Sequence, residues 1–231
     1  RHGQTSWNET HRFQGWQDIE LSNVGMNQAY KISTYFKDIE YDHLYSSDLI
    51  RALRTAQIIQ AKHDATMTIT KGLRELDVGN WEGLTFEEIV ESNHGETITN
   101  MDDLWKSSRE DGESLVQFQE RVVKEFEKIL VKSEGKDIII VTHGGVIRVI
   151  LCYVLKCEMS EINHNKIDNG SISILEISKN NQYIKEKLKL KFIADTELLE
   201  EQSSLIKVAY FILDFLNLKS YRGHLFFLGS I

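Results

Sequence analysis

The chain has 231 residues, of which 41% are hydrophobic and 27% are charged, and its net charge is −8. This is the balance of a globular domain, so a disordered chain and a membrane-embedded helical bundle are excluded. The negative charge repels a phosphate backbone and no basic run offsets it, so we expect no nucleic-acid partner.

Helices and short strands alternate along the first half of the chain. Apolar residues at helical spacing predict helices over residues 23–37 and 49–62. A short strand over residues 43–46 separates them. Ser114 and Gln117 have the spacing of a capping box and indicate the start of a long helix.

The second half continues the alternation. The run over residues 138–142 is apolar until its last residue, as expected of a strand covered on both faces, and two glycines then lead into a helix over residues 146–155. Two more strands are predicted over residues 172–177 and 184–193. Such an order of elements is typical of an α/β layer fold.

From about residue 201 the composition changes. The segment 205–218 is apolar nearly all round, but it is too short and too charged to span a bilayer. We therefore expect a catalytic domain over residues 1–200 and an apolar C-terminal tail over residues 201–231. The tail is interpreted as a helix packed on the domain or on a second copy in a homo-oligomer. Membrane contact is the weaker alternative, because the amphipathic face of a peripheral anchor is missing.

Neither the cysteines nor the histidines form a metal-binding pattern. Cys152 and Cys157 are the two cysteines, and their spacing offers neither a disulfide framework nor a CxxC motif. The histidines show no HxxxH or HExxH spacing. We expect no metal site and a cytoplasmic location.

Four segments carry residues suited to phosphoryl transfer: RHGQTSWN at 1–8, SSDLIRALRTA at 46–56, LRELDVGNWEG at 73–83 and VTHGG at 141–145. Phosphoryl transfer requires fixed cations around a dianion, an in-line nucleophile and, for a poor leaving group, a proton donor. Arg1 and Arg51 offer guanidinium groups, and His2 and His143 offer imidazoles. Glu75 offers a carboxyl group.

Each of these residues also has an ordinary structural explanation. A histidine beside a glycine is often only hydrogen-bonded, and Glu75 could be an ion-pair partner of Arg74. Position favours the functional interpretation, because His143 ends an apolar strand just before a helix N-terminus, where backbone N–H groups attract anions. Arg54 and Arg148 are interpreted as structural.

Taken together and in this order, the four segments resemble the histidine phosphatase superfamily, also called the phosphoglycerate mutase-like family, over about residues 1–199. The resemblance implies a three-layer α/β/α sandwich around a mostly parallel central sheet. It implies that His2 attacks phosphorus and becomes phosphohistidine, and that Glu75 protonates the leaving oxygen. The residues that would bind the phosphoryl group are Arg1, Asn8, Gln14, Gly15, Arg51, His143 and Gly144.

One strand of the family pattern is missing from the sequence. In the family an apolar strand leads into the RHG motif, whereas here Arg1 opens the chain. If the sequence is complete, a central row of sheet hydrogen bonds is lost. We expect the intact protein to contain this strand.

The expected reaction is hydrolysis of a small phosphorylated metabolite without a metal or other cofactor. The resemblance implies that phosphoglycerate mutases carry a longer, basic insertion between Trp81 and Ser114, whereas this stretch is short and acidic. The layout is similar to bacterial α-ribazole phosphatases and broad-specificity phosphatases, which suggests α-ribazole phosphate as one substrate. A cofactor-dependent phosphoglycerate mutase and a non-catalytic relative that binds a phosphorylated ligand are the alternatives.

Overall fold

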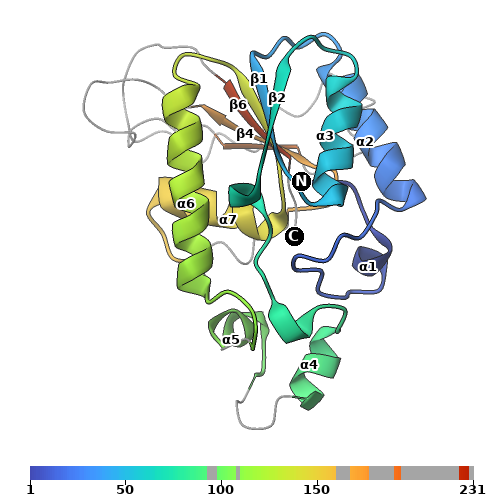
Figure 1. The fold of residues 1–231 in the computed structure, drawn as a ribbon, viewed down its shortest axis with the longest axis vertical. Helices are drawn as coiled ribbons and strands as arrows, with labels where there is room; N and C mark the ends of the chain where they lie inside the picture. Colours follow the sequence, from blue (N-terminus) through green and yellow to red (C-terminus); the bar gives the residue numbers. More distant parts are fainter. Residues whose placement is uncertain (93–97, 108–109, 160–166, 177–189, 194–223, 229–231) are drawn as a thin grey trace.

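A computed structural model describes residues 1–92, 98–107, 110–159, 167–176, 190–193 and 224–228. Its centre is a sheet of six strands in the order β2-β1-β3-β6-β4-β5 (Figure 1). The strands are β1 (His43–Ser47), β2 (Thr66–Thr70), β3 (Ile138–Val141), β4 (Ile172–Glu176), β5 (Leu190–Ile193) and β6 (His224–Leu228). The pairs β2–β1, β1–β3 and β3–β6 are parallel, and β4 is antiparallel to both of its neighbours. The sheet is therefore mostly parallel, as expected.

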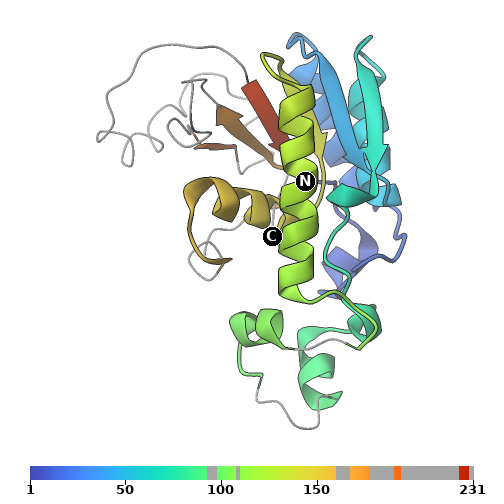
Figure 2. The same ribbon diagram turned by 60° about the vertical axis from the view of Figure 1, so that its left-hand side comes forward.

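Helices cover both faces of the sheet, which gives the three expected layers (Figure 2). One face carries α2 (Asn23–Phe36) and α3 (Ile50–Gln60), and the other carries α6 (Leu115–Lys132) and α7 (Gly144–Leu155). The short helices are α1 (Ser6–Glu9), α4 (Phe86–Ser92) and α5 (Met101–Lys106), with 3₁₀ turns η1 (Lys71–Leu73) and η2 (Gly79–Trp81). Figure 1 shows α4 and α5 beyond the end of the sheet, where they extend the molecule.

Local chemistry explains where the long helices begin. The Ser22 hydroxyl accepts a hydrogen bond from the Gly25 N–H at the start of α2. Ser114 and Gln117 form the capping box that the sequence predicts at the start of α6. The buried face of α6 is Phe118, Val122, Phe126 and Ile129, at helical spacing, and it packs against β3 and α7.

The sheet corrects two expectations about the ends of the chain. The place beside β3 is filled by β6, which pairs with β3 on one side and β4 on the other, so the expected loss of a central row of hydrogen bonds is wrong. Residues 224–228 lie in the C-terminal tail, which was expected to be a packed helix, but they form a strand. Unpaired N–H and C=O groups at two strand edges favour any apolar segment of high strand propensity that can reach them, and HLFFL is such a segment.

The other differences are smaller. Helix α7 begins at Gly144, two residues before the expected start. The sequence analysis did not predict the edge strand β2, although its residues TMTIT alternate polar and apolar side chains; none of the five is fully buried. The expected strand over 184–193 is described only from Leu190 onwards. Apart from residues 224–228, the tail over 201–231 lies outside the described residues.

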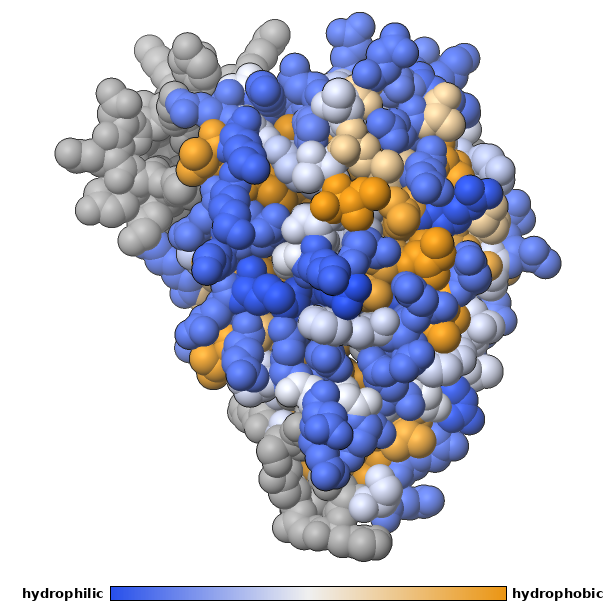
Figure 3. All heavy atoms as spheres, viewed as in Figure 1, coloured by the Kyte–Doolittle hydropathy of each residue, from blue (hydrophilic) through white to orange (hydrophobic). Residues whose placement is uncertain are grey.

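The surface agrees with the composition of the chain. On the face drawn in Figure 3, hydrophilic side chains predominate, and most of the hydrophobic ones lie in a group right of centre. Within the described ranges, no helix is both long enough and apolar enough to cross a bilayer.

Candidate active site

His2 is held in one tautomer by the backbone that follows it. The residue is 2% exposed, and its Nδ1 lies 2.7 Å from the carbonyl oxygen of Gly3. Because a carbonyl can only accept, Nδ1 carries the proton and Nε2 keeps its lone pair. Burial lowers the pKa of His2 well below its ordinary value of 6.5, and the charges of Arg1 and Arg51 lower it further. At neutral pH the ring is therefore a neutral imidazole with a nucleophilic nitrogen.

His143 lies against His2, although the two residues are far apart in the sequence. It caps α7 at the carboxyl end of β3, and the two ring centroids are 5.1 Å apart. Its Nε2 lies 2.8 Å from the hydroxyl of Ser47, the last residue of β1. Its Nδ1 is buried and has no hydrogen-bond partner among the described residues. Burial, and then the charge of Arg51, lowers the pKa of His143 well below 6.5.

Two buried guanidinium groups border the histidines. Arg51, in the first turn of α3, is 1% exposed and donates to the backbone oxygens of Gln17 at 2.7 Å and Gly15 at 2.8 Å. Burial lowers the pKa of Arg51 to about 10, and it lowers the pKa of Arg1 to about 10 as well. Both remain cations at neutral pH, so this end of the site is prepared for an anion.

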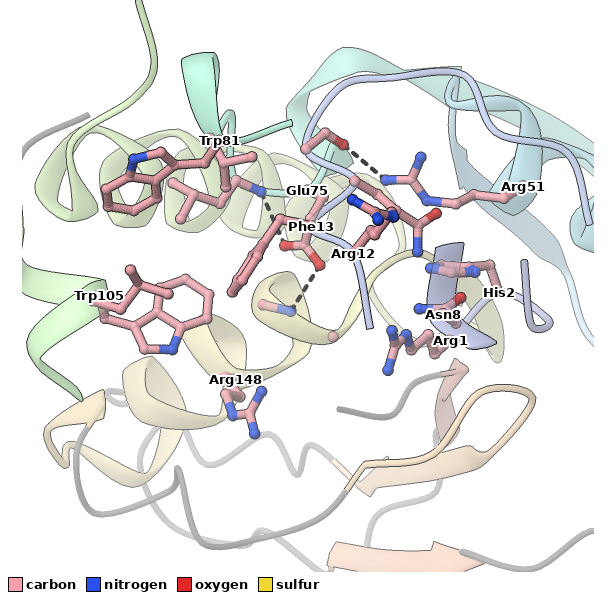
Figure 4. A pocket seen from close by; sticks show the side chains of 17 residues that line it. Arg1, His2, Asn8, Arg12, Phe13, Arg51, Glu75, Trp81, Trp105 and Arg148 are labelled. Atoms are coloured by element: carbon pink, nitrogen blue, oxygen red, sulfur yellow. Dashed lines mark hydrogen bonds between the residues drawn. The ribbon is translucent and has the colours of Figure 1, made fainter. Parts of the chain in front are cut away.

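The Glu75 carboxylate is held by two backbone N–H groups (Figure 4). Leu76 donates to its Oε1 at 2.9 Å, and Gly145 donates to its Oε2 at 3.1 Å. A Cβ on residue 145 would overlap Oε1 of Glu75, so a larger residue there would displace the carboxylate from this position. The carboxylate is thereby fixed against the first turn of α7.

A guanidinium from α6 holds the backbone that carries Glu75. Arg121 donates to the carbonyl oxygens of Arg74 at 3.0 Å and Glu75 at 3.1 Å. Its charge is balanced by the Glu113 carboxylate, at 2.6 and 2.7 Å. The Trp16 indole also donates to the Glu75 carbonyl, at 2.8 Å. Nothing in the sequence indicated Arg121, because its partners are backbone atoms of a distant segment.

The other expected phosphate contacts lie in the same pocket: Asn8, Gln14, Gly15 and Gly144 all line it. Asn8 has a structural task as well, since its side-chain oxygen accepts from the Thr5 N–H at 3.0 Å in the capping box of α1. Gly15 adopts a φ of 50°, a left-handed conformation that directs its carbonyl toward Arg51. The structure thus brings every site residue expected from the sequence into one region.

The pocket has a volume of about 250 Å³ and two chemically different ends. The phosphate end contains Arg1, His2, Arg51 and Gly144, and Glu75 lies between the two ends. The alcohol end is apolar and aromatic, and its lining residues are Phe13, Leu76, Val78, Trp81, Leu104 and Trp105. The view in Figure 4 shows Trp81 and Trp105 on the side away from Arg1 and His2.

One residue that the sequence analysis interprets as structural lies in the pocket. Arg148 was interpreted as structural, but it lines the pocket one turn after Gly144 on α7. By contrast, Arg54 is exposed and lies outside the pocket lining. Residues four apart on a helix share a face, and this spacing was the available signal for Arg148.

Comparisons with known proteins agree with this geometry. The family model described as "Histidine phosphatase superfamily (branch 1)" matches residues 1–188. "Phosphoglycerate mutase-like protein 4" of Arabidopsis thaliana is 35% identical over 77% of this chain and 77% of its own. "Metal-independent phosphoserine phosphatase" of the same plant is 32% identical over 77% of this chain and 74% of its own.

A solved structure supports the same relationship. "Bacillus stearothermophilus YhfR" superposes with a TM-score of 0.73 at 26% identity, covering 84% of this chain and 94% of that one. The family model spans most of the chain, and the motifs that it shares with the chain meet in one buried site. The protein therefore belongs to the histidine phosphatase superfamily.

Proposed function

We propose that the protein hydrolyses small phosphomonoesters through a phosphohistidine at His2, without a metal ion. The observation that carries the proposal is a neutral imidazole, fixed in one tautomer, beside two buried cations in a small pocket. A nucleophile, an anion cradle and a carboxyl group are the parts that phosphoryl transfer requires.

The reaction proceeds by two displacements. Nε2 of His2 forms a bond to phosphorus while the bond between phosphorus and the alcohol oxygen breaks, and Glu75 gives a proton to that oxygen. Arg1 and Arg51 neutralise the charge on the phosphoryl oxygens. In the second step Glu75 takes a proton from water, the water oxygen bonds to phosphorus, and the P–N bond breaks. Phosphate leaves, and His2 regains its lone pair.

The test is hydrolysis of p-nitrophenyl phosphate in the presence of EDTA, combined with trapping of an acid-labile phosphoenzyme. The wild-type protein is expected to turn over and to be labelled. His2→Ala is expected to abolish both, because the proposed nucleophilic nitrogen is removed. His11→Asn is the matched control, since His11 is exposed with a φ of 53°, a conformation that asparagine tolerates.

A protein that binds phosphate but is neither labelled nor active would refute hydrolysis and favour the non-catalytic alternative. Full activity of His2→Ala would remove His2 from the chemistry. Loss of wild-type activity in EDTA would contradict metal independence. Among the described residues, no group of three or more histidine, cysteine or acidic side chains is arranged to hold a metal.

A phosphoglycerate mutase is the second candidate, favoured by the name of the mutase-like relative from Arabidopsis. A mutase must retain a bisphosphate intermediate, so its activity depends on a bisphosphate primer. Interconversion of 2- and 3-phosphoglycerate that requires 2,3-bisphosphoglycerate and outpaces phosphate release would favour the mutase. We favour hydrolysis because the segment between Trp81 and Ser114 is short and acidic.

The physiological alcohol remains to be found by a screen of phosphorylated metabolites. α-Ribazole phosphate belongs in that screen, since an aromatic base would contact the apolar end of the pocket. Phosphoserine belongs in it as well, because one relative is named a phosphoserine phosphatase.

A further inference from the structure

Arg148 extends from α7 into the pocket, beyond the phosphate end. It follows Gly144 by four residues, so the two lie on the same helix face, about 6 Å apart along the axis. A long side chain on a helix leans back toward the N-terminus, which here means toward the pocket. In the view of Figure 4, Arg148 lies between Trp105 and Arg1.

The Arg148 guanidinium is buried, and it forms no ion pair or hydrogen bond with the described residues. The residue is 5% exposed, and its Nε is a buried donor with no hydrogen-bond partner. Burial lowers the pKa of Arg148 and the negative charge of Glu75 opposes this shift, but the two residues form no hydrogen bond. The Glu75 oxygens instead accept hydrogen bonds from the N–H groups of Leu76 and Gly145. A buried cation and an unmade hydrogen bond are both costly unless a ligand completes them.

The charges around the pocket show what such a ligand must carry. A phosphomonoester dianion would be matched by Arg1 and Arg51, which border His2 at the phosphate end. Arg12 already forms an ion pair with a carboxylate of α4 at 2.8 Å. Arg148 is then the remaining cation of the described pocket lining. A substrate whose only anionic group is the phosphoryl group would form no ion pair with it.

We infer that Arg148 binds a carboxylate on the alcohol half of the substrate, about one helical turn from the phosphoryl group. This inference rests on the proposed function and narrows its substrate to short phosphorylated hydroxy acids. A guanidinium presents two parallel N–H donors to a planar carboxylate, which gives geometry as well as charge. The pocket volume of about 250 Å³ suits a short carbon chain between the two anionic groups.

The experiment compares substrates that differ only in the carboxylate. 3-Phosphoglycerate is paired with glycerol 3-phosphate, and phosphoserine is paired with phosphoethanolamine. The wild-type protein is expected to prefer the acid of each pair by at least about 10-fold in kcat/KM. Arg148→Gln is expected to reduce that preference by about 10- to 100-fold, because a hydrogen-bonded charge pair is lost.

Two variants serve as controls. Arg54→Gln removes an exposed arginine outside the pocket and is expected to keep the wild-type preference. Arg148→Lys keeps the charge but loses the two parallel donors, so an intermediate preference is expected. It also keeps the test valid if the glutamine variant does not fold, which would be seen as failure to form phosphoenzyme from p-nitrophenyl phosphate.

The outcomes separate this inference from the proposed function. A protein that hydrolyses p-nitrophenyl phosphate but shows no preference for the acids would overturn the role of Arg148 alone. So would a preference for α-ribazole phosphate or for a bisphosphate without a carboxylate, or an equal loss on both members of a pair in Arg148→Gln. Absence of hydrolysis with every ester would overturn the proposed function itself.

Discussion

The two ends of the pocket are built in different ways. The phosphate end takes Arg51 and Gly144 from the first turns of α3 and α7. It takes Arg1 and His2 from the N-terminal segment, where the His2 N–H donates to the Thr142 carbonyl at the end of β3 at 3.0 Å. The alcohol end takes Leu104 and Trp105 from α5, a helix of six residues beyond the sheet (Figure 1). The phosphate end is closely hydrogen-bonded, whereas the alcohol end is apolar, and the Arg148 guanidinium beside it has no ion pair within the described ranges.

This difference separates the reaction from the choice of substrate. Fixed donors around the phosphoryl group act on every phosphomonoester alike, so changes there should slow all substrates together. Contacts at the alcohol end exist only for particular leaving groups, so changes there should alter selectivity. Short elements outside the main layers can vary without disturbing the sheet.

The largest expected effect comes from Glu75, which lies between the two ends. Glu75→Gln should slow hydrolysis of glycerol 3-phosphate by about 10³-fold, because an alkoxide needs a proton to leave. p-Nitrophenyl phosphate should be slowed far less, since nitrophenolate leaves without one. Steady-state kcat for the two esters checks this, and equal slowing would remove the proton-donor role.

Arg51→Lys tests whether a change at the phosphate end lowers kcat/KM equally for esters of different alcohols. The lysine keeps the charge but replaces the two guanidinium nitrogens that donate to the Gly15 and Gln17 carbonyls by a single nitrogen, so the hydrogen bonds that hold the cation in place are weakened. We expect kcat/KM to fall by about 10²-fold, equally for esters of good and poor leaving groups. A fall confined to one class of ester would contradict the division between the two ends.

Arg121 gives a smaller effect with a distinctive signature. Arg121→Lys removes the hydrogen bonds to the Arg74 and Glu75 carbonyls, so the carboxyl group is held less exactly in place. We expect about a 10-fold loss with glycerol 3-phosphate and little change with p-nitrophenyl phosphate. Lys128→Gln, which removes an exposed ion pair on the same helix, is the control. A purely structural role would slow both esters equally.

The last effect is on stability rather than on turnover, and it arises from the buried imidazoles of the phosphate end. The pKa values of His2 and His143 are lowered well below 6.5, so below that pH the unfolded chain binds protons that the folded protein does not. The free energy of unfolding should therefore fall with decreasing pH, by about 1.4 kcal/mol per pH unit for each histidine below about pH 6.5. Urea titrations at pH 7, 6 and 5 check this. His143→Gln should make the dependence shallower, and an unchanged slope would contradict it.

Local sequence determined much of this protein. The capping pair Ser114 and Gln117, and the apolar run of β3, each depend on neighbours in the chain, so their patterns identified the elements. The motif residues His2, Arg51, Glu75 and His143 were also recognised. The four motifs that contain these residues occur together in the order typical of the family, and this combination is specific for it.

Contacts between distant segments were decided only by the tertiary structure. β6 takes its place because β3 and β4 leave two edges to be paired, and nothing in HLFFL states which edges it will meet. Arg121 donates to backbone carbonyls, which every residue has, so no pattern of side chains in the sequence could predict this contact. In the sequence, Arg148 does not differ from any other arginine on a helix. Only the folded structure buries its guanidinium without an ion pair in the described part of the chain. Sequence patterns record local preferences, whereas burial and pairing are properties of the assembled layers.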